Sequence, residues 1–223
     1  MAAIIDLDHD SYNQNDAILF SRISNDLLNK GYSIKLNALP ILLANQLYQH
    51  VSMMSDESFA EAAIGRDQEH MKNVFVRSQK LSWITGDSMA GANWLSWAAS
   101  LQAYLNRHLF LGLFSFESHY AHYGPGDFYK RHYDAFKGVS SRSLSIIVYL
   151  NRNWLSNEGG ELVLYQDGDD TVGLKVTPSF ATVVAFLSSD YPHEVLRTHR
   201  DRYSIAGWFS PNTTTSSRVD PPR

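Results

Sequence analysis

The sequence predicts an α+β protein with a double-stranded β-helix (jelly-roll) core backed by N-terminal helices, and three observations support this fold class. Apolar residues recur at helical spacing in the first half of the chain, and from Phe114 onward the period switches to two. The later segments are short and are separated by clusters of Gly, Pro and Asp, as in barrels and sandwiches. Helices that precede the strands favour helices packed on one sheet of a two-sheet barrel.

Helices are predicted at three places. Residues 13–30 and 40–54 each carry apolar side chains at amphipathic spacing. The clearest helix is 91–110, in which one apolar stripe is formed by Trp94, Trp97, Ala98, Leu101, Tyr104 and Leu105. Tryptophans in such a stripe favour packing against a sheet over a stacking platform for a ligand.

Strands are predicted wherever short apolar segments alternate or lie between turn residues. Two of them, at 32–37 and 81–85, fall among the helices. The others follow one another in the second half of the chain, at 114–123, 143–151, 161–166, 172–178, 181–187 and 202–209. This run supplies enough short strands for two sheets.

The length and composition favour one elaborated domain rather than several. We divide the 223 residues into an N-terminal helical support region (1–75), a core (76–210) and a flexible tail (211–223). Residues 55–75 are polar and suggest a long loop, and we hypothesise that 64–79 form a lid whose closed state the sequence does not define. The polar tail has no core to bury.

Charge and cysteine content exclude several classes of function. A net charge of −4 and an isoelectric point near 6.1 give no basic footprint, so no nucleic-acid partner is expected. The chain has no cysteine, which excludes disulfides, cysteine-ligated zinc or iron–sulfur clusters and cysteine nucleophiles. No signal peptide or membrane span is indicated, and we expect a cytoplasmic monomer without a membrane partner.

Two histidines and one aspartate form the candidate metal site. His132 and Asp134 are two residues apart, so on an extended backbone they lie on one side, and His193 follows 59 residues after Asp134. Two imidazoles and one carboxylate can hold one face of a non-haem Fe(II) ion and leave three positions open. Arg202, nine residues after His193, supplies a fixed cation for a doubly charged co-substrate.

Two rival classes use the same residues. A zinc hydrolase could use the three side chains as ligands with a bound water, but it gives no role to Arg202. A non-catalytic binding module that has kept the barrel would have no reason to keep all three ligands together with Arg202. The pattern therefore favours an iron enzyme.

Longer motifs resemble a known family. The chain resembles the 2-oxoglutarate- and Fe(II)-dependent prolyl 4-hydroxylases, and among them the oxygen-sensing, hypoxia-inducible-factor branch and its bacterial relatives. The resemblance covers residues 77–209 in one collinear match. Its motifs are YGPGDFYKRHYD (123–134), SIIVYLNRNW (145–154), GGELVLY (159–165), PSFATVVAF (178–186) and YPHEVL with RYSIAGWF (191–209).

The resemblance implies roles for nine residues. His132, Asp134 and His193 would be the metal ligands. The co-substrate would be bound by Arg202 and Tyr149 at its distal carboxylate and by Tyr123 near its oxoacid end. The substrate groove would be lined by Arg77, Arg142 and Trp208.

The resemblance also implies a reaction. The chain would use Fe(II), 2-oxoglutarate and O2, with ascorbate as a reductant, to hydroxylate C4 of a prolyl residue in a protein or peptide substrate and release succinate and CO2. Elongation factor Tu is the substrate that bacterial relatives suggest, and a free amino acid or small metabolite is the alternative. The carboxylate ligand Asp134 favours hydroxylation over halogenation. Ser78 and Gln79 depart from the family, which has Gly-Asp where the substrate is clasped.

Overall fold

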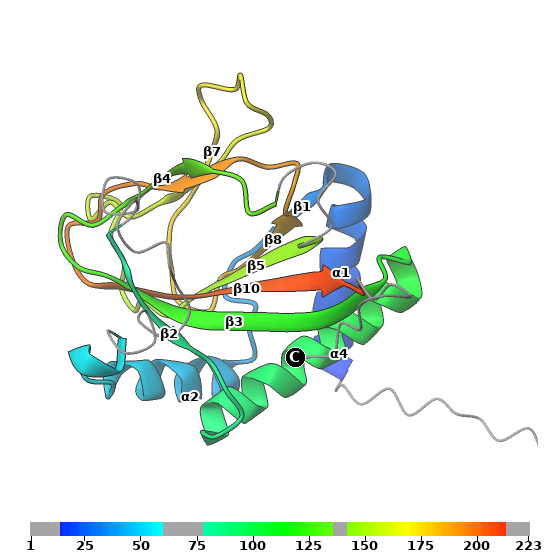
Figure 1. The fold of residues 1–223 in the computed structure, drawn as a ribbon, viewed down its shortest axis with the longest axis horizontal. Coiled ribbons are helices and arrows are strands. Elements are labelled where there is room, and N and C mark those ends of the chain that lie inside the picture. Colours follow the sequence, from blue (N-terminus) through cyan, green and yellow to red (C-terminus); the bar gives the residue numbers. More distant parts are fainter. Residues whose placement is uncertain (1–13, 60–77, 136–141, 213–223) are drawn as a thin grey trace, which may run out of the picture.

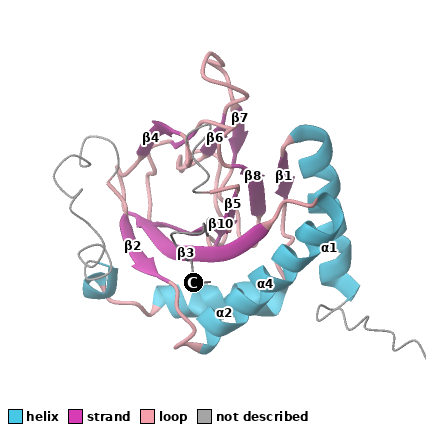
Figure 2. Ribbon diagram, turned by 45° about the vertical axis from the view of Figure 1, so that its right-hand side comes forward, coloured by secondary structure: helices cyan, strands magenta, loops and turns pink. Residues whose placement is uncertain are grey.

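The computed structural model describes residues 14–59, 78–135 and 142–212. Two antiparallel sheets face each other, and the helices cover the outer face of the larger sheet (Figures 1 and 2). This architecture confirms the predicted α+β fold with a jelly-roll core. The hypothetical lid falls mostly on residues 60–77, and these lie outside the described residues, as does the tail from 213 onward.

Three helices lie close to their predicted positions. They are α1 (Gln14–Lys30), α2 (Ile41–Ser52) and α4 (Met89–Leu109). The hydroxyl of Ser88 caps α4 by accepting a hydrogen bond from the Gly91 amide at 3.0 Å. Phe110 ends the same helix in the left-handed conformation, with φ of 54°. A short helical segment at 56–59 stands where the sequence indicated only loop, so that part of the expectation was wrong.

Ten strands form the two sheets in the described part of the chain. The larger sheet has the order β1 (Tyr32–Lys35), β8 (Val183–Leu187), β5 (Leu144–Tyr149), β10 (Arg202–Pro211), β3 (Leu113–Tyr123) and β2 (Lys80–Trp83). The smaller sheet has the order β4 (Tyr129–His132), β9 (His193–Val195), β6 (Leu162–Leu164) and β7 (Leu174–Val176). Strands β4 and β9 were not among the segments predicted from alternation, but they confirm that His132 lies on an extended backbone and that His193 comes from another strand of the barrel, as the ligand spacing predicted.

The larger sheet separates two apolar cores. Alternate residues of β10 point to opposite faces, so Ile205 and Phe209 join the core between this sheet and the helices. In that core Trp94 donates to the Ser118 hydroxyl at 2.9 Å and Trp97 to Asp16 at 3.1 Å. The second core lies between the sheets and comprises Ala121, Tyr123, Tyr149, Val184, Phe186, Leu162, Leu164, Val176 and Val195. The helix tryptophans therefore pack on the sheet, as the sequence suggested.

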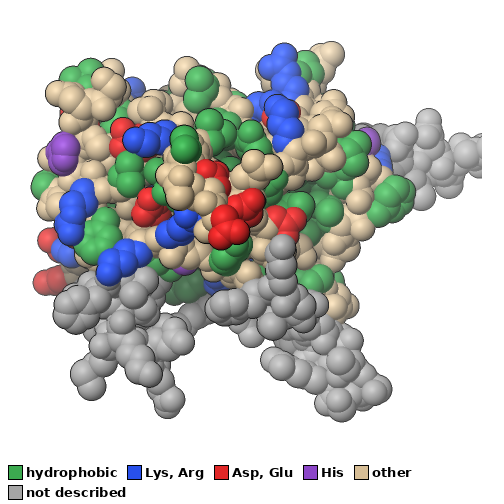
Figure 3. Space-filling view, turned by 90° about the horizontal axis from the view of Figure 1, so that it is seen from above, with side chains coloured by type: hydrophobic (Ala, Val, Ile, Leu, Met, Phe, Trp, Pro, Cys, Tyr) green, Lys and Arg blue, Asp and Glu red, His purple; other side chains and the backbone are tan. Residues whose placement is uncertain are grey.

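The surface carries charges of both signs. On the face above the smaller sheet, Lys and Arg side chains alternate with acidic and apolar ones instead of gathering in one basic field (Figure 3). The exposed loop after β6 adds Asp167 and Asp169 to this side of the molecule. Among the residues described, no helix combines the length and apolarity that crossing a bilayer requires.

The helix–sheet core gives a first prediction. Trp94 is fully buried, so Trp94→Ala removes a large side chain and one hydrogen bond, and we expect a loss of about 3–5 kcal/mol in the free energy of unfolding. Urea unfolding followed by circular dichroism measures it. Leu42→Ala, on a side chain that is 76% exposed, is the control and should change stability by less than about 0.5 kcal/mol. Equal losses in the two variants would contradict this packing.

Candidate active site

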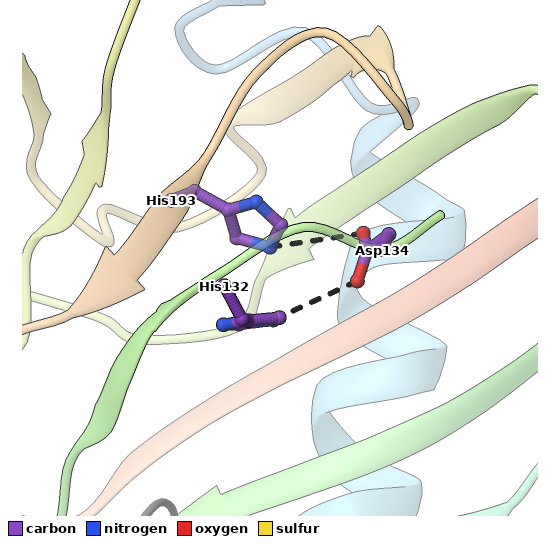
Figure 4. A group of neighbouring side chains, drawn as sticks. All are labelled: His132, Asp134 and His193. Carbon is purple, nitrogen blue, oxygen red and sulfur yellow. Dashed lines mark ion pairs between the residues drawn. The ribbon is translucent and has the colours of Figure 1, made fainter. Parts of the chain in front are cut away.

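The three predicted metal ligands converge at one end of the barrel (Figure 4). His132 ends β4 and lies directly opposite His193, the first residue of β9. Asp134 follows β4 by two residues, and its carboxylate oxygens lie 3.6 Å from the His132 Nε2 atom and 3.7 Å from the His193 Nε2 atom. One ligand atom from each residue lies within 4.8 Å of the others, which suits a single metal ion.

Backbone carbonyls fix both imidazoles in the orientation that a metal needs. The Nδ1 atom of His132 lies 2.8 Å from the Lys130 carbonyl oxygen, and that of His193 lies 3.1 Å from the Tyr191 carbonyl oxygen. A carbonyl oxygen can only accept, so each Nδ1 carries the proton and each Nε2 keeps its lone pair. Burial lowers the pKa of His193 to about 4, against the opposing effect of Asp134, so this ring is neutral near neutral pH.

Asp134 is held as an anion in a buried position. Its side chain is 8% exposed, and its Oδ2 atom accepts a hydrogen bond of 2.6 Å from the Ser145 hydroxyl. Burial by itself would raise the pKa of Asp134, but the nearby His193 and His132 and the Ser145 hydroxyl outweigh burial and hold this pKa well below its usual range. The chain therefore supplies two imidazole Nε2 atoms and one anionic oxygen to the site.

Arg202 places a buried cation inside the barrel. It is 1% exposed at the start of β10, opposite Tyr123 of β3. Its Nε atom donates to the Gly160 carbonyl at 2.8 Å, and its Nη1 atom donates to the Ser204 hydroxyl at 3.2 Å. Within the described part of the chain these hydrogen-bond partners are neutral. A buried charge without an anionic partner is costly, and a bound carboxylate would remove that cost.

Two tyrosines flank the guanidinium. The Arg202 Cζ atom lies 4.8 Å from the centre of the Tyr123 ring and 5.1 Å from that of Tyr149. The hydroxyl of Tyr149 is buried, lies near Arg202 and has no hydrogen-bond partner of standard geometry. Burial raises the pKa of Tyr149 to about 12, although Arg202 opposes this, so the group is a proton donor. The cation and the unused donor together fit a carboxylate ligand.

Gly160 is needed for the close approach of Arg202. Its φ is +69°, a conformation that favours glycine. A Cβ atom at this position would lie 3.0 Å from the Arg202 Cδ atom and 3.2 Å from the Thr198 Cβ atom. Its carbonyl also accepts the Arg202 Nε–H bond, so Gly160 sets the position of the guanidinium.

Two of the predicted groove residues are in mutual contact. The Arg142 guanidinium stacks on the Trp208 ring, with the Cζ atom 3.9 Å from the ring centre, and donates to Glu117 at 3.1 Å. Trp208 lies opposite both Glu117 and Ser145 in the sheet, which places this cluster beside Asp134. Arg77, the third predicted groove residue, lies outside the described residues.

Several site residues could not be found by inspecting the sequence for ligands. Gly160 and Ser145 lie within motifs that carried the family resemblance, but no role was assigned to them. Ser204 follows Arg202 by two residues, and the period of the strand is the one signal that would have placed it on the same face. Ser188, which contacts Ser145, is a buried serine after a strand and gave no such signal.

A jelly roll with a His-Asp-His group at one end and a buried arginine inside defines an Fe(II) oxygenase that takes an acidic co-substrate. The family model of the 2OG-Fe(II) oxygenase superfamily matches residues 118–210. This family uses Fe(II), 2-oxoglutarate and O2, and the match spans all three candidate ligands and Arg202.

Comparison with individual proteins shows which group of the superfamily the chain resembles. A prolyl-4-hydroxylase from Pseudomonas putida superimposes with a TM-score of 0.72 at 32% identity, covering 86% of this chain and 99% of that one. A prolyl hydroxylase from Trichoplax adhaerens, solved with a hypoxia-inducible-factor peptide, gives 0.73 at 25% identity over 90% and 94% of the two chains. The chain belongs to the prolyl hydroxylases of the 2OG-Fe(II) oxygenase superfamily. Human prolyl hydroxylase EGLN3 is 34% identical over 88 residues, which span 39% of this chain and only 36% of that relative.

The geometry predicts one divalent metal ion per chain. We expect His132→Ala and His193→Ala to weaken Mn(II) binding at least about 100-fold, because loss of even an outer-shell partner costs 10–100-fold. Isothermal titration calorimetry on metal-free protein measures the affinity. His108→Ala, on a histidine that bonds a carbonyl of its own helix, is the control. Undiminished binding in both ligand variants would disprove the site.

Proposed function

We propose that this chain is a 2-oxoglutarate-, O2- and Fe(II)-dependent dioxygenase that hydroxylates C4 of a prolyl residue in a protein substrate. The substrate C–H bond becomes C–OH, while 2-oxoglutarate is converted to succinate and CO2. The chain spans about a third of the curated EGLN3 relatives, so their activity is carried over as part of this proposal. The similarity over nearly the whole length of the Pseudomonas putida prolyl-4-hydroxylase supports it.

The observation that carries the proposal is the buried cation Arg202 of the larger sheet, which borders the same intersheet core as the ligand group of the smaller sheet. His193 packs on Phe186 with ring centres 4.8 Å apart, and Phe186 belongs to the same intersheet core as Tyr123 and Tyr149. Arg202 stands over these two tyrosines. A dianion could place one carboxylate at Arg202 and the other at a metal ion held by the three ligands. It would then neutralise positive charge at both places.

The chain's own residues bind, orient and exclude water. Bound iron would supply the oxidation by O2, and His132, Asp134 and His193 would hold it on one face. Arg202 and the Tyr149 hydroxyl would bind the distal carboxylate, and Tyr123 would limit the position of the oxoacid end. The apolar side chains of the intersheet core keep water from this interior, which strengthens the charge-assisted hydrogen bonds.

The substrate assignment rests on the cluster beside Asp134. Arg142, whose side chain is 30% exposed, stacks on the largely buried ring of Trp208, and this pair would contact the ring and carbonyl groups of a prolyl segment. Arg77 is proposed to contact the same substrate. We propose a translation GTPase such as elongation factor Tu as the protein that carries the proline. We further propose that the chain works as a cytoplasmic monomer with ascorbate as its reductant; the absence of cysteine is compatible with that compartment.

Substitutions at Arg202 and Tyr149, which would bind the distal carboxylate, are predicted to change the KM for 2-oxoglutarate without changing the affinity for metal. Tyr149→Phe removes only a hydroxyl without a standard partner, so we expect unchanged stability and a KM for 2-oxoglutarate raised about 2- to 12-fold. Arg202→Ala should raise that KM by about 10- to 150-fold, because a bond to a charged group is lost, while Mn(II) affinity stays near that of the wild type.

The matched control is Arg152→Ala, since Arg152 contacts Asn45 and the rings of Tyr48 and Phe180 on the helix side of the molecule. Succinate formation at varied 2-oxoglutarate is the assay. A KM that is unaltered in both pocket variants would contradict the assigned role of Arg202 and Tyr149.

Product analysis tests the reaction itself. With Fe(II), ascorbate and 2-oxoglutarate, we expect a proline-containing substrate protein to gain the mass of one oxygen at a prolyl residue, in equal amount to the succinate formed. Asp134→Ala should abolish both products, because the anionic ligand is lost. Tandem mass spectrometry locates the hydroxyl group. Hydroxylation of free proline or another small metabolite, with none in protein, would favour the alternative substrate class.

A further inference from the structure

The carboxylate of Asp134, which follows the smaller sheet, is held by side chains of the larger sheet. Asp134 follows β4 of the smaller sheet, whereas Ser145, which donates to its Oδ2 atom at 2.6 Å, lies in β5 of the larger sheet. Ser145 in turn lies 2.9 Å, oxygen to oxygen, from the hydroxyl of Ser188, which follows β8. Both serines are buried, with 1% and 0% of their surface exposed. These contacts therefore tie the two sheets together at the end of the barrel where the candidate ligands meet.

The hydrogen bonds in this cluster have one direction. The carboxylate of Asp134 is an anion and can only accept, so the single hydroxyl proton of Ser145 is directed to it. Ser145 then has only lone pairs to offer to Ser188, and Ser188 must donate to Ser145. The result is a relay, Ser188 to Ser145 to Asp134, in which each hydroxyl orients the next and polarises it.

The backbone of Ser188 holds the same segment a second time. Its carbonyl accepts a hydrogen bond of 3.3 Å from the amide of Ala135, the residue directly after Asp134, and its own amide donates to the Ser143 carbonyl at 3.1 Å. The Ser188 carbonyl therefore fixes the main chain beside Asp134, while its hydroxyl acts on the side chain through Ser145. Asp134 lies in a bend after β4, and these contacts hold both its side chain and the adjacent main chain.

We propose that Ser145 and Ser188 are positioning residues that fix the Asp134 carboxylate in the orientation in which its two oxygens face the two imidazoles, Oδ1 at 3.6 Å from the His132 Nε2 atom and Oδ2 at 3.7 Å from the His193 Nε2 atom. The inference rests on the proposed metal role of Asp134. A carboxylate without these hydrogen bonds could rotate and move its oxygens away from the two Nε2 atoms beside which they now lie. The relay aligns the carboxylate before any metal arrives.

Cobalt(II) binding to metal-free protein tests the relay without reference to turnover. We expect Ser145→Ala to weaken Co(II) binding by about 10- to 100-fold, as other outer-shell losses do, and to change the visible Co(II) absorption because the carboxylate is no longer held in one orientation. Ser145→Thr keeps the hydroxyl and should restore both the affinity and the spectrum. Ser188→Ala leaves the last hydrogen bond in place and should give a smaller loss of affinity than Ser145→Ala.

Ser33→Ala is the matched control, because Ser33 is also a buried serine of the larger sheet whose hydroxyl donates to a carboxylate, that of Asp26, at 3.0 Å. It should cost stability without altering the Co(II) affinity or spectrum.

If the wild type binds cobalt and Ser145→Ala binds it equally well with an unchanged spectrum, the relay is disproved while the metal centre stands. If the wild type binds no cobalt, the metal centre itself fails and the relay fails with it. If Ser145→Ala does not fold, the affinity of Ser188→Ala decides, and an unchanged value disproves the relay.

Discussion

The interior of this protein depends on one constraint: the Arg202 guanidinium is enclosed between two sheets and has no anionic partner among the described residues. Arg202 is 1% exposed, and its hydrogen bonds within the described residues go to a carbonyl and a hydroxyl. Neutral partners and two aromatic faces reduce the cost of burying that charge but do not neutralise it. The barrel wall therefore favours a ligand that brings negative charge, and the unpartnered hydroxyl of Tyr149 beside it supplies one more donor for that ligand. Co-substrate binding and protein stability are coupled through this one side chain.

The jelly-roll topology explains how residues far apart in the sequence form this interior. Because β4 and β9 are antiparallel neighbours in register, His132 and His193 stand directly opposite each other despite the long chain between them. Because β10 lies between β3 and β5, Arg202 and Ser204 face Tyr123 and Tyr149 across adjacent strands. The helices contribute only to the other face of the larger sheet, where Trp94 and its neighbours pack. One sheet thus separates the residues that stabilise the fold from those that bind ligands.

Much of this arrangement could be predicted from the sequence, and the reasons for the misses are physical. Helices were located within a few residues because their apolar stripes are long, and the ligand set and Arg202 stood in motifs of unusual residue types. Strands β4 and β9 have no apolar alternation of their own, so they were expected only from the ligands His132 and His193 that they carry. Ser145, Ser188 and Gly160 escaped for a different reason: a hydroxyl or a missing Cβ acquires its role only from what the fold places against it.

The two arginines of the site differ in a way that separates chemistry from specificity. Arg142 is 30% exposed at its side chain, is paired with Glu117 and stacks on Trp208, so its charge is already compensated before any substrate binds. Arg202 has neither solvent nor an anion among its described partners, and it therefore binds its ligand with most of its electrostatic energy still available. If Arg142 and Trp208 contact the substrate as proposed, changes around them would alter which prolyl segment fits without disturbing the interior charge. Changes around Arg202 would disturb the buried charge directly, because Gly160, Ser204 and both tyrosines contact its side chain. Under the proposed roles, the barrel interior would determine the reaction and the Arg142–Trp208 pair would determine the choice of substrate.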